Sequence, residues 1–279
     1  MTNEEKILQK WDSLTIKDNF IFGKTMEVNA DLCRRLIEQI LNIKIKSISY
    51  PEREKTIDAR IDSKGIRLDV YVEDELNRSF DIEIQLTDND DLAKRMRYYH
   101  SLIDLDKLHK GKSVKYKSLG ESFVIFICTF DVFGYGYQVY DFEIVCKRNA
   151  EVKLKDMTHR IFLCTEGNDE EISDEVRDFL DYVAGRRIKS DFIKELDEAV
   201  QKIKESKEWR LSYMTYELAL MEREELGEKR GEEKGRFELV KNLLRVGTPI
   251  EYIINATGWS KEKLLEFKKS HIDSQISGE

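Results

Sequence analysis

The sequence predicts an α/β fold in which a central mixed sheet is flanked by helices and followed by an α-helical extension. Up to about residue 185, stretches that alternate apolar and polar residues, as strands do, are interspersed with stretches of three-to-four-residue spacing, as in helices. From Ile172 to the end the pattern is helical and charged. We therefore expect a domain over residues 1–185, a long charged helical segment over 186–235 and a small helical region over 236–279.

The composition is that of a heavily charged globular protein. Hydrophobic residues make up 41% and charged residues 37% of the 279 positions, which suits one large domain with an appendage or two small domains. No apolar run reaches the length of a membrane span, and the first residues lack the apolar core of a signal peptide, so we expect a cytoplasmic protein without a membrane partner. The four cysteines form no Cys-x-x-Cys pair, which favours buried free thiols.

Two helices are predicted before the first strand. Residues 3–14 carry apolar side chains at helical spacing, which predicts a short helix whose Trp11 packs on the core. A second helix begins at Asn29 or Asp31, either of which suits the capping position, and runs to about Leu41.

A hairpin is the centre of the predicted sheet. Residues 66–72 and 80–86 each alternate apolar and polar side chains, which predicts two strands. The polar residues 73–79 between them are few enough for a hairpin connection. Shorter strands are expected upstream, at residues 47–50 and 56–61.

Three polar side chains project from one face of this hairpin. Because side chains in a strand alternate with period two, Asp69, Glu83 and Gln85 all lie opposite the apolar face. Two carboxylates held a few ångströms apart repel each other unless a proton or a cation lies between them. Such oxygen ligands suit a hard divalent cation such as Mg²⁺. The alternative is an ordinary amphipathic hairpin whose acids face solvent.

A helix is predicted after the hairpin, beginning at Thr87 or Asp88, because apolar residues then recur every three to four positions. This helix carries Arg95 and Tyr99 one turn apart, close after the second strand. An arginine there suits bidentate binding of a phosphate or stabilisation of charge in a transition state. Pairing with Asp91 on the helix surface is the alternative.

The remaining strands follow that helix. Residues 122–130 are almost continuously apolar, which predicts a central strand covered on both faces. Further strands are expected at residues 137–146 and 159–164, and a helix at 175–184 that stops near Gly185. The order strand, strand, helix, strand is that of an α/β core.

The C-terminal third is predicted to be helical. Residues 190–235 indicate one or two long charged helices, and residues 248–269 indicate two short helices around a glycine turn, either a helix-turn-helix or a small cap. Glycine recurs every fourth residue from Gly227 to Gly235, as in a close helix–helix seam or a flexible linker. An apolar stripe from Ile193 to Met221 needs a packing partner, and the same helix of a second subunit predicts a homodimer.

The formal net charge of -8 disfavours a protein that coats nucleic acid indiscriminately, although it does not exclude a nuclease. Residues 107–117 are locally basic and contain Tyr116; they either hold a phosphate backbone or form a solvated loop. Their lysines are Lys107, Lys110, Lys112, Lys115 and Lys117. Residues 166–181 are locally acidic, with eight carboxylates, and should face away from DNA.

Asp69 and the Glu83-Ile84-Gln85 run, with thirteen residues between the two acids, resemble the core of the PD-(D/E)XK nuclease superfamily. The resemblance is strongest to the branch of recombination-promoting nucleases and transposases, in which glutamine replaces the usual lysine. The sequence departs from the wider pattern at Gln85 and at Leu68, where a proline often precedes the aspartate. Further matches span residues 15–185: Phe20–Gly23, Leu36-Ile37-Glu38, Arg95, Tyr98-Tyr99 and the strand from Phe123 to Phe130.

The resemblance implies a restriction-endonuclease-like fold and a metal-dependent DNA endonuclease. It implies that Asp69 and Glu83 hold Mg²⁺, or Mn²⁺, and that Gln85 orients a water that it is too weak a base to deprotonate. Glu38 on the first core helix then joins the metal site, unless it is an ordinary exposed helix acid. The residues expected to contact DNA are Arg95, Tyr99, Lys110, Lys112 and Lys115.

A second function class fits the same residues. A non-catalytic nucleic-acid-binding or assembly protein would keep the fold with a weakened site, and both the acidic net charge and Gln85 in place of lysine favour it. A transposase proper normally needs a third acid on a distant helix of another fold, which nothing in this sequence demands.

Overall fold

The computed structural model describes residues 2–49, 52–57, 66–109 and 115–269. The chain forms two compact units, Met1–Tyr213 and Met214–Glu279, each of which is described by itself below. None of the described helices is long and apolar enough to cross a membrane.

A six-stranded mixed sheet forms the centre of the first unit and confirms the predicted α/β fold class. The strand order is β1-β2-β3-β4-β8-β5. β1, β2 and β3 pair antiparallel, β3, β4 and β8 pair parallel, and β5 closes the other edge antiparallel to β8. The bounds are β1 Glu52–Ile57, β2 Ile66–Glu73, β3 Ser79–Gln85, β4 Ser122–Cys128, β5 Val139–Phe142 and β8 Thr158–Cys164.

β4 is the central strand that its apolar sequence predicts. It pairs with β3 on one side and β8 on the other, and every one of its residues is buried. A strand buried on both faces cannot alternate polar and apolar side chains, which explains its sequence. The predicted strand at residues 137–146 is two shorter pieces, β5 and β6 Val145–Cys146, and β6 pairs with β7 Asn149–Lys153 in a separate hairpin.

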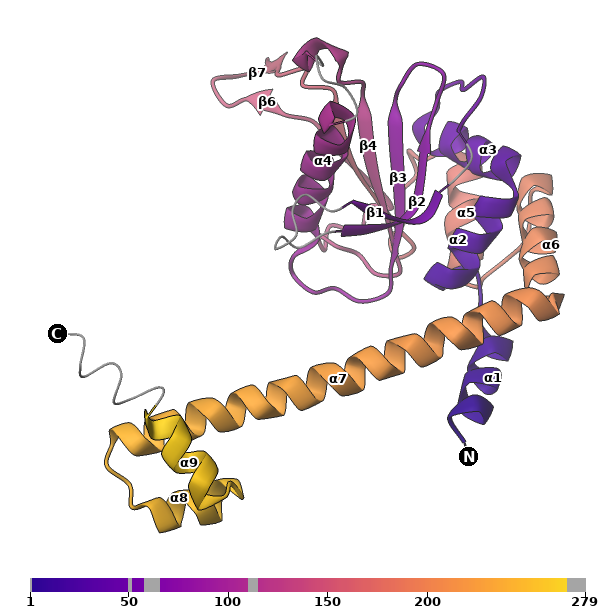
Figure 1. Cartoon of the computed structure of the whole chain (residues 1–279). Helices are drawn as coiled ribbons and strands as arrows, with labels where there is room; N and C mark the ends of the chain where they lie inside the picture. Colours follow the sequence, from indigo (N-terminus) through magenta and orange to yellow (C-terminus); the bar gives the residue numbers. More distant parts are fainter. Residues whose placement is uncertain (1, 50–51, 58–65, 110–114, 270–279) are drawn as a thin grey trace. The chain divides into compact units, whose positions relative to one another are not determined.

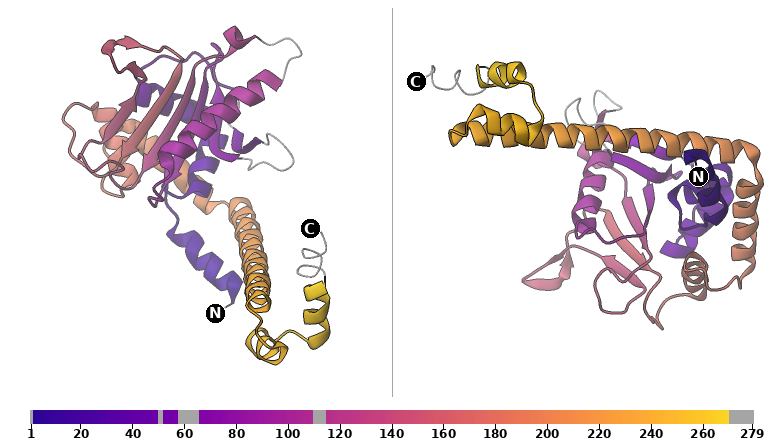
Figure 2. Two further views of the ribbon diagram at one scale, coloured as in Figure 1. Left: turned by 90° about the vertical axis from the view of Figure 1, so that its left-hand side faces the viewer. Right: turned by 90° about the horizontal axis from the view of Figure 1, so that it is seen from below.

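Helices cover the two faces of the sheet (Figures 1 and 2). α4, Leu92–His109, lies on one face. On the other side lie α2 Asn19–Val28, α3 Ala30–Leu41, α5 Asp174–Val183 and α6 Asp191–Glu205. α1, Asn3–Ser13, begins with a capping box between Thr2 and Glu5, and its Trp11 is buried as predicted.

Several helices and strands begin or end at residues other than those predicted from the sequence. α4 begins at Leu92 rather than at Thr87 or Asp88, because the Asp88 side chain accepts a hydrogen bond from the Asp90 backbone and Asp90 takes a positive φ of 57°. β3 ends at Gln85, so Leu86 is exposed instead of buried. Within the described part of the predicted strand at 47–50, residues 47–49, only Ile48 forms a bridge, to Asp74. Residue 50 and residues 58–61 lie outside the described residues.

Three of the four cysteines are buried free thiols, as predicted, and Cys146 is exposed. Cys128 and Cys164 are register partners on β4 and β8. Burial raises the pKa of Cys164 to about 11 and that of Cys33 to about 12. These two thiols are therefore unreactive at neutral pH.

The apolar stripe of α6 is buried against other helices of the same chain. It is therefore not available for the packing on the same helix of a second subunit that the sequence predicted. Ile193, Leu196, Val200 and Ile203 are buried, and α6 packs on α2 and α5. The residues after 185 therefore continue the first unit as far as Tyr213. The three segments with boundaries at residues 185 and 235 stay a prediction about separable parts of the chain.

The second unit has a small core of its own. It contains the C-terminal part of α7, Lys207–Arg245, with α8 Ile250–Thr257 and α9 Lys261–Lys268. Gly258 ends α8 with a φ of 68°, the conformation for which glycine is favoured. The buried side chains are Val240, Ile253, Trp259, Leu264 and Phe267.

The predicted glycine series lies within α7, which continues through it as a helix. No described atom lies within 4 Å of a Cβ built on Gly227, Gly231 or Gly235. The described part of the chain therefore supplies neither a packed seam nor a break in the helix at these positions.

His100 on α4 makes the stability of the first unit depend on pH. It is buried, with Nδ1 at 2.7 Å from Ser122 Oγ, and burial, assisted by Arg160, lowers its pKa from 6.5 to about 4. Between pH 6.5 and about pH 4, His100 is therefore protonated in the unfolded chain and neutral in the folded chain. Stability is present above pH 6.5 and is lost as the pH falls through this window.

We expect His100→Gln to reduce this acid destabilisation, by up to about 3 kcal/mol between neutral pH and pH 4, since one pKa unit corresponds to about 1.4 kcal/mol. Urea denaturation of both proteins across this range measures the difference. Parallel pH profiles for the variant and the wild type would contradict the assignment.

Candidate functional site

The two predicted carboxylates meet on neighbouring strands. β2 and β3 pair with Val70 opposite Ile82, which brings Asp69 opposite Glu83. The Asp69 backbone N–H donates to Glu83 Oε1 at 2.9 Å, and the Ile84 N–H donates to Asp69 Oδ2 at 3.4 Å. Each carboxylate is thus oriented by the backbone of the other strand.

The polar face of the hairpin is covered by α4 instead of facing solvent. Glu83 is 2% exposed and Gln85 8% exposed. The reason is the parallel pairing of β3 with β4, which sets Glu83 beside Phe126 and Gln85 beside Cys128, in the apolar layer under α4. An ordinary amphipathic hairpin with solvent-facing acids is therefore excluded.

Arg95 of α4 points to this cluster. Its Nη1 donates to Gln85 Oε1 at 2.8 Å and its Nη2 to Tyr99 Oη at 2.9 Å. Nη2 also lies 3.8 Å from Glu83 Oε2. The guanidinium is only 28% exposed, so the alternative of a surface pair with Asp91 does not describe its position. Arg95 is the nearest positive charge to the carboxylates that these contacts reveal.

Asp81 is a third carboxylate of the cluster, which the sequence analysis missed. It lies two residues before Glu83, on the same face of β3, and is fully buried. Neither of its oxygens accepts a hydrogen bond from a described N–H or hydroxyl group. The period-two rule that selected Glu83 and Gln85 also selects Asp81.

Burial and mutual repulsion disfavour the charged forms of these acids. Burial raises the pKa of Glu83 well above its usual range, and the charge of Asp69 raises it further. Burial also raises the pKa of Asp81, followed by repulsion from Glu83 and Asp69. Carboxylates held in this way are stabilised by a bound proton or cation.

The donor set fits a hard divalent cation. Its atoms are carboxylate oxygens, with an amide beside them, as Mg²⁺ and Mn²⁺ prefer. No group of three His, Cys, Asp or Glu side chains that would hold a metal occurs within the described residues. Two carboxylates remain sufficient, because Mg²⁺ usually keeps several waters and takes one or two carboxylates with substrate oxygens.

Glu38 is not brought to this cluster, which corrects its predicted role. It lies on α3, across the sheet from α4 (Figure 1). Its Oε2 accepts from Arg34 at 2.8 Å and its Oε1 from the Ile45 backbone at 2.9 Å. The adjoining Lys44 carbonyl accepts from Arg78 at the β2–β3 turn, far along β3 from Gln85. Glu38 therefore stabilises the turn after α3.

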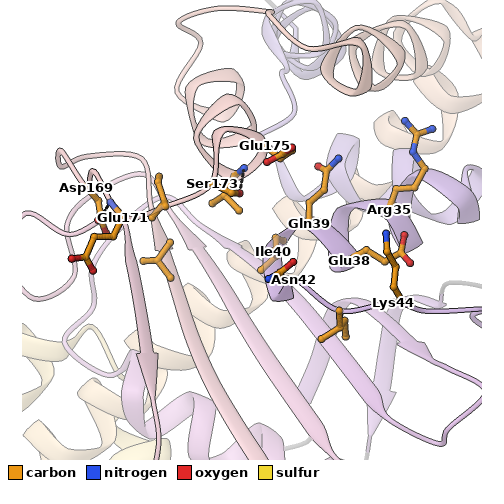
Figure 3. A pocket seen from close by; sticks show the side chains of 14 residues that line it. Arg35, Glu38, Gln39, Ile40, Asn42, Lys44, Asp169, Glu171, Ser173 and Glu175 are labelled. Atoms are coloured by element: carbon orange, nitrogen blue, oxygen red, sulfur yellow. Dashed lines mark hydrogen bonds between the residues drawn. The ribbon is translucent and has the colours of Figure 1, made fainter.

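Glu38 lines a separate pocket of about 860 Å³ (Figure 3). The pocket lies between the end of α3 and the residues that lead into α5. Its lining mixes basic and acidic side chains, Arg35 and Lys44 with Asp169, Glu171 and Glu175. It shares no lining residue with the Asp69–Glu83 cluster.

Of the three lysines predicted to contact DNA, Lys115 lies within the described residues. Lys110 and Lys112 lie outside the described residues. Lys115 is exposed and precedes the short 3-10 helix Tyr116–Ser118. Asn77 of the β2–β3 turn donates to the Ser118 carbonyl at 3.4 Å, so Lys115 lies at the opposite end of β3 from Gln85. Lys115 therefore does not adjoin the acidic cluster, and its contact with DNA stays a prediction.

Gln85 and Arg95 allow a test of the geometry of the cluster. We expect Gln85→Ala to lower any metal-dependent cleavage and also to destabilise the fold by about 1–3 kcal/mol, because the half-buried Arg95 loses an acceptor. Plasmid cleavage and chemical denaturation measure the two effects. Leu86→Ala, one residue away and exposed, is the matched control. Unchanged cleavage in Gln85→Ala would contradict a role for the amide.

Comparison with known proteins agrees with this geometry. A family model described as PD-(D/E)XK nuclease family transposase matches residues 19–238, which include the whole six-stranded sheet and the acidic cluster. No curated protein and no solved structure matches the chain. The family supports a nuclease-like or transposase-related function. Because the match covers most of its length, the chain belongs to the PD-(D/E)XK nuclease family transposases.

Proposed function

We propose that this protein is a metal-dependent DNA endonuclease that hydrolyses phosphodiester bonds. The observation that carries the proposal is the pairing of Asp69 with Glu83 on a buried face, next to a third acid and near Arg95. Folding such a cluster is costly unless a cation or a proton compensates the charges. A bound cation would compensate these charges, so the acidic cluster is a candidate cation site.

Each residue then has a definable role. Asp69 and Glu83 would hold Mg²⁺ or Mn²⁺, which when bound would lower the pKa of a water and neutralise the scissile phosphate. Gln85 accepts from Arg95 through Oε1, which leaves its amide N–H groups to donate to a water or a phosphate oxygen. Arg95 and Tyr99 adjoin the cluster and are our proposed DNA contacts.

The experiment that tests the function is cleavage of supercoiled plasmid by the full chain, with Mg²⁺ and with EDTA. Nicked or linear product only in the presence of metal supports the endonuclease. Duplex DNA and RNA of the same sequence, offered side by side, test the substrate class, because the motif chemistry alone permits either.

A non-catalytic nucleic-acid-binding protein is the second candidate. The observation that favours it is the low exposure of Glu83 and Gln85, which restricts the access of a phosphate to the acids. The two candidates differ in one measurement: the second predicts DNA binding without any product in the plasmid assay.

We also propose a homodimer, now formed through α7 alone. Leu211 and Leu218 are exposed on this helix, and their spacing of seven residues places them on one of its faces. A long helix with an exposed apolar stripe is stabilised by a partner. Sedimentation velocity of the full chain tests this, and a monomer across the micromolar range would contradict it.

A further inference from the structure

A groove of about 390 Å³ is lined entirely by aromatic side chains. Tyr135 is 78% exposed, Tyr137 55% and Phe142 42%, whereas Tyr140 is buried beneath them. The rings contact one another, with centroids 4.8 Å apart for Phe133–Tyr140 and 5.7 Å apart for Tyr137–Tyr140. Exposed aromatic rings gathered in one groove form a candidate binding surface.

Asp131 holds the loop that carries these rings. Its Oδ1 accepts from the Phe133 N–H at 3.1 Å and from Tyr140 Oη at 2.8 Å, and its Oδ2 accepts from the Gly136 N–H at 2.7 Å. Burial opposes ionisation of Asp131, but these hydrogen bonds together outweigh it and lower the pKa of the carboxyl, so it keeps its charge. The groove is therefore built before any ligand binds, which lowers the entropic cost of binding.

The groove lies in the layer under α4, three strands from β3: Tyr140 on β5 is the register partner of Phe162 on β8, Phe162 that of Phe126 on β4, and Phe126 that of Glu83. Its loop follows β4, whose last residue Cys128 is the register partner of Gln85. The next residue, Thr129, donates from its N–H to the Gln85 carbonyl at 3.0 Å. A neighbouring pocket of about 210 Å³ is lined by Phe133 and Phe142 of the groove and by Met96 of α4, the residue after Arg95.

We propose that this groove stacks the unpaired bases of a single-stranded DNA segment, three strands along the sheet from the acidic cluster. Every base has a π-face, so aromatic rings bind single strands without reading their sequence. The inference rests on the proposed nuclease function, and it narrows the substrate to DNA that carries a single-stranded stretch.

The charges around the groove favour bases over phosphates as its occupants. Asp169, Glu170 and Glu171 line a pocket that also includes Tyr137, so part of the acidic stretch expected to face away from DNA lies next to the groove, where it repels phosphate. Arg160 lines the neighbouring pocket on the side of α4, where a backbone passing toward the cluster would meet it. A single DNA strand whose bases stack on the rings and whose phosphates point toward α4 would keep its phosphates away from these acids and close to Arg160.

The test is binding of a fluorescent oligothymidylate of about 20 nucleotides to the full chain in EDTA, where metal-dependent cleavage does not occur. An oligonucleotide of equal length without bases and a duplex serve as the other two probes. Tyr135→Ala removes an exposed ring at no cost to the core, and Tyr135→Phe retains the ring. Tyr116→Ala removes a ring that is 84% exposed elsewhere on the surface and is the matched control.

We expect the wild type to prefer oligothymidylate over the baseless strand, and Tyr135→Ala to weaken that binding by roughly 5- to 100-fold. The duplex and the baseless strand should bind the variant unchanged, and Tyr135→Phe and Tyr116→Ala should behave as the wild type. Equal wild-type affinities for the two single strands would overturn the inference. So would loss of a dimer in Tyr135→Ala, which would identify a second copy of the chain as the occupant.

The outcome is separable from that of the nuclease proposal. Because binding is measured without metal, a protein that never cleaves plasmid can still show base stacking, and an active nuclease can fail to show it.

Discussion

Asp69→Asn is expected to abolish metal-dependent cleavage and, with it, the thermal stabilisation of the protein by Mg²⁺. In the wild type, metal at about 100 times its Kd adds about 2.7 kcal/mol to the stability of the folded state by mass action. For a unit of this size that raises the Tm by roughly 5–10 °C. Removing one of two charged ligands should eliminate the shift and lower the cleavage rate by roughly 1000-fold or more.

The substitution is chosen so that folding survives it. An asparagine at this position keeps an oxygen that accepts from the Ile84 N–H. Glu73→Gln is the matched control, because Glu73 lies on the same face of β2 but contacts Tyr71 and Lys107 at the other end of the strand. The assignment of the metal site fails if Mg²⁺ raises the Tm of Asp69→Asn as much as that of the control.

Asp81→Asn is expected to stabilise the metal-free protein at neutral and alkaline pH. The acid is fully buried next to Glu83, and its pKa is raised well above the ordinary value of 3.8. Replacing a poorly compensated buried charge with a neutral group of the same shape typically stabilises by about 1–4 kcal/mol. The new amide can also donate to Glu83, which the carboxylate cannot do once it is ionised.

The direction of the pH dependence distinguishes this effect from a general improvement in packing. A raised carboxyl pKa contributes stability that is fully present below the unfolded value and is lost as the pH rises through the folded value. The advantage of Asp81→Asn should therefore grow from pH 5 to pH 8, as followed by thermal unfolding in EDTA. A constant difference across this range, or a destabilised variant, would show that Asp81 carries no such penalty.

The acidic hairpin and the elements around it were predictable from the sequence, because local periodicity encodes which residues share a face. Alternation with period two sets Asp69, Glu83 and Gln85 on one side of a hairpin, and helical spacing sets Arg95 one turn from Tyr99. A continuous apolar run can only be a strand covered on both faces, which is what β4 is.

What covers each face was decided only by the tertiary structure. The parallel pairing of β3 with β4 buries the polar face under α4, which makes Asp81 part of the cluster and turns exposed acids into buried ones. α4 runs from the Gln85 end of the sheet to the end at which Lys115 lies. α3, which carries Glu38, lies on the other face of the sheet. The physical reason is that periodicity specifies the face on which a side chain lies, whereas burial and charge compensation depend on contacts between segments far apart in sequence.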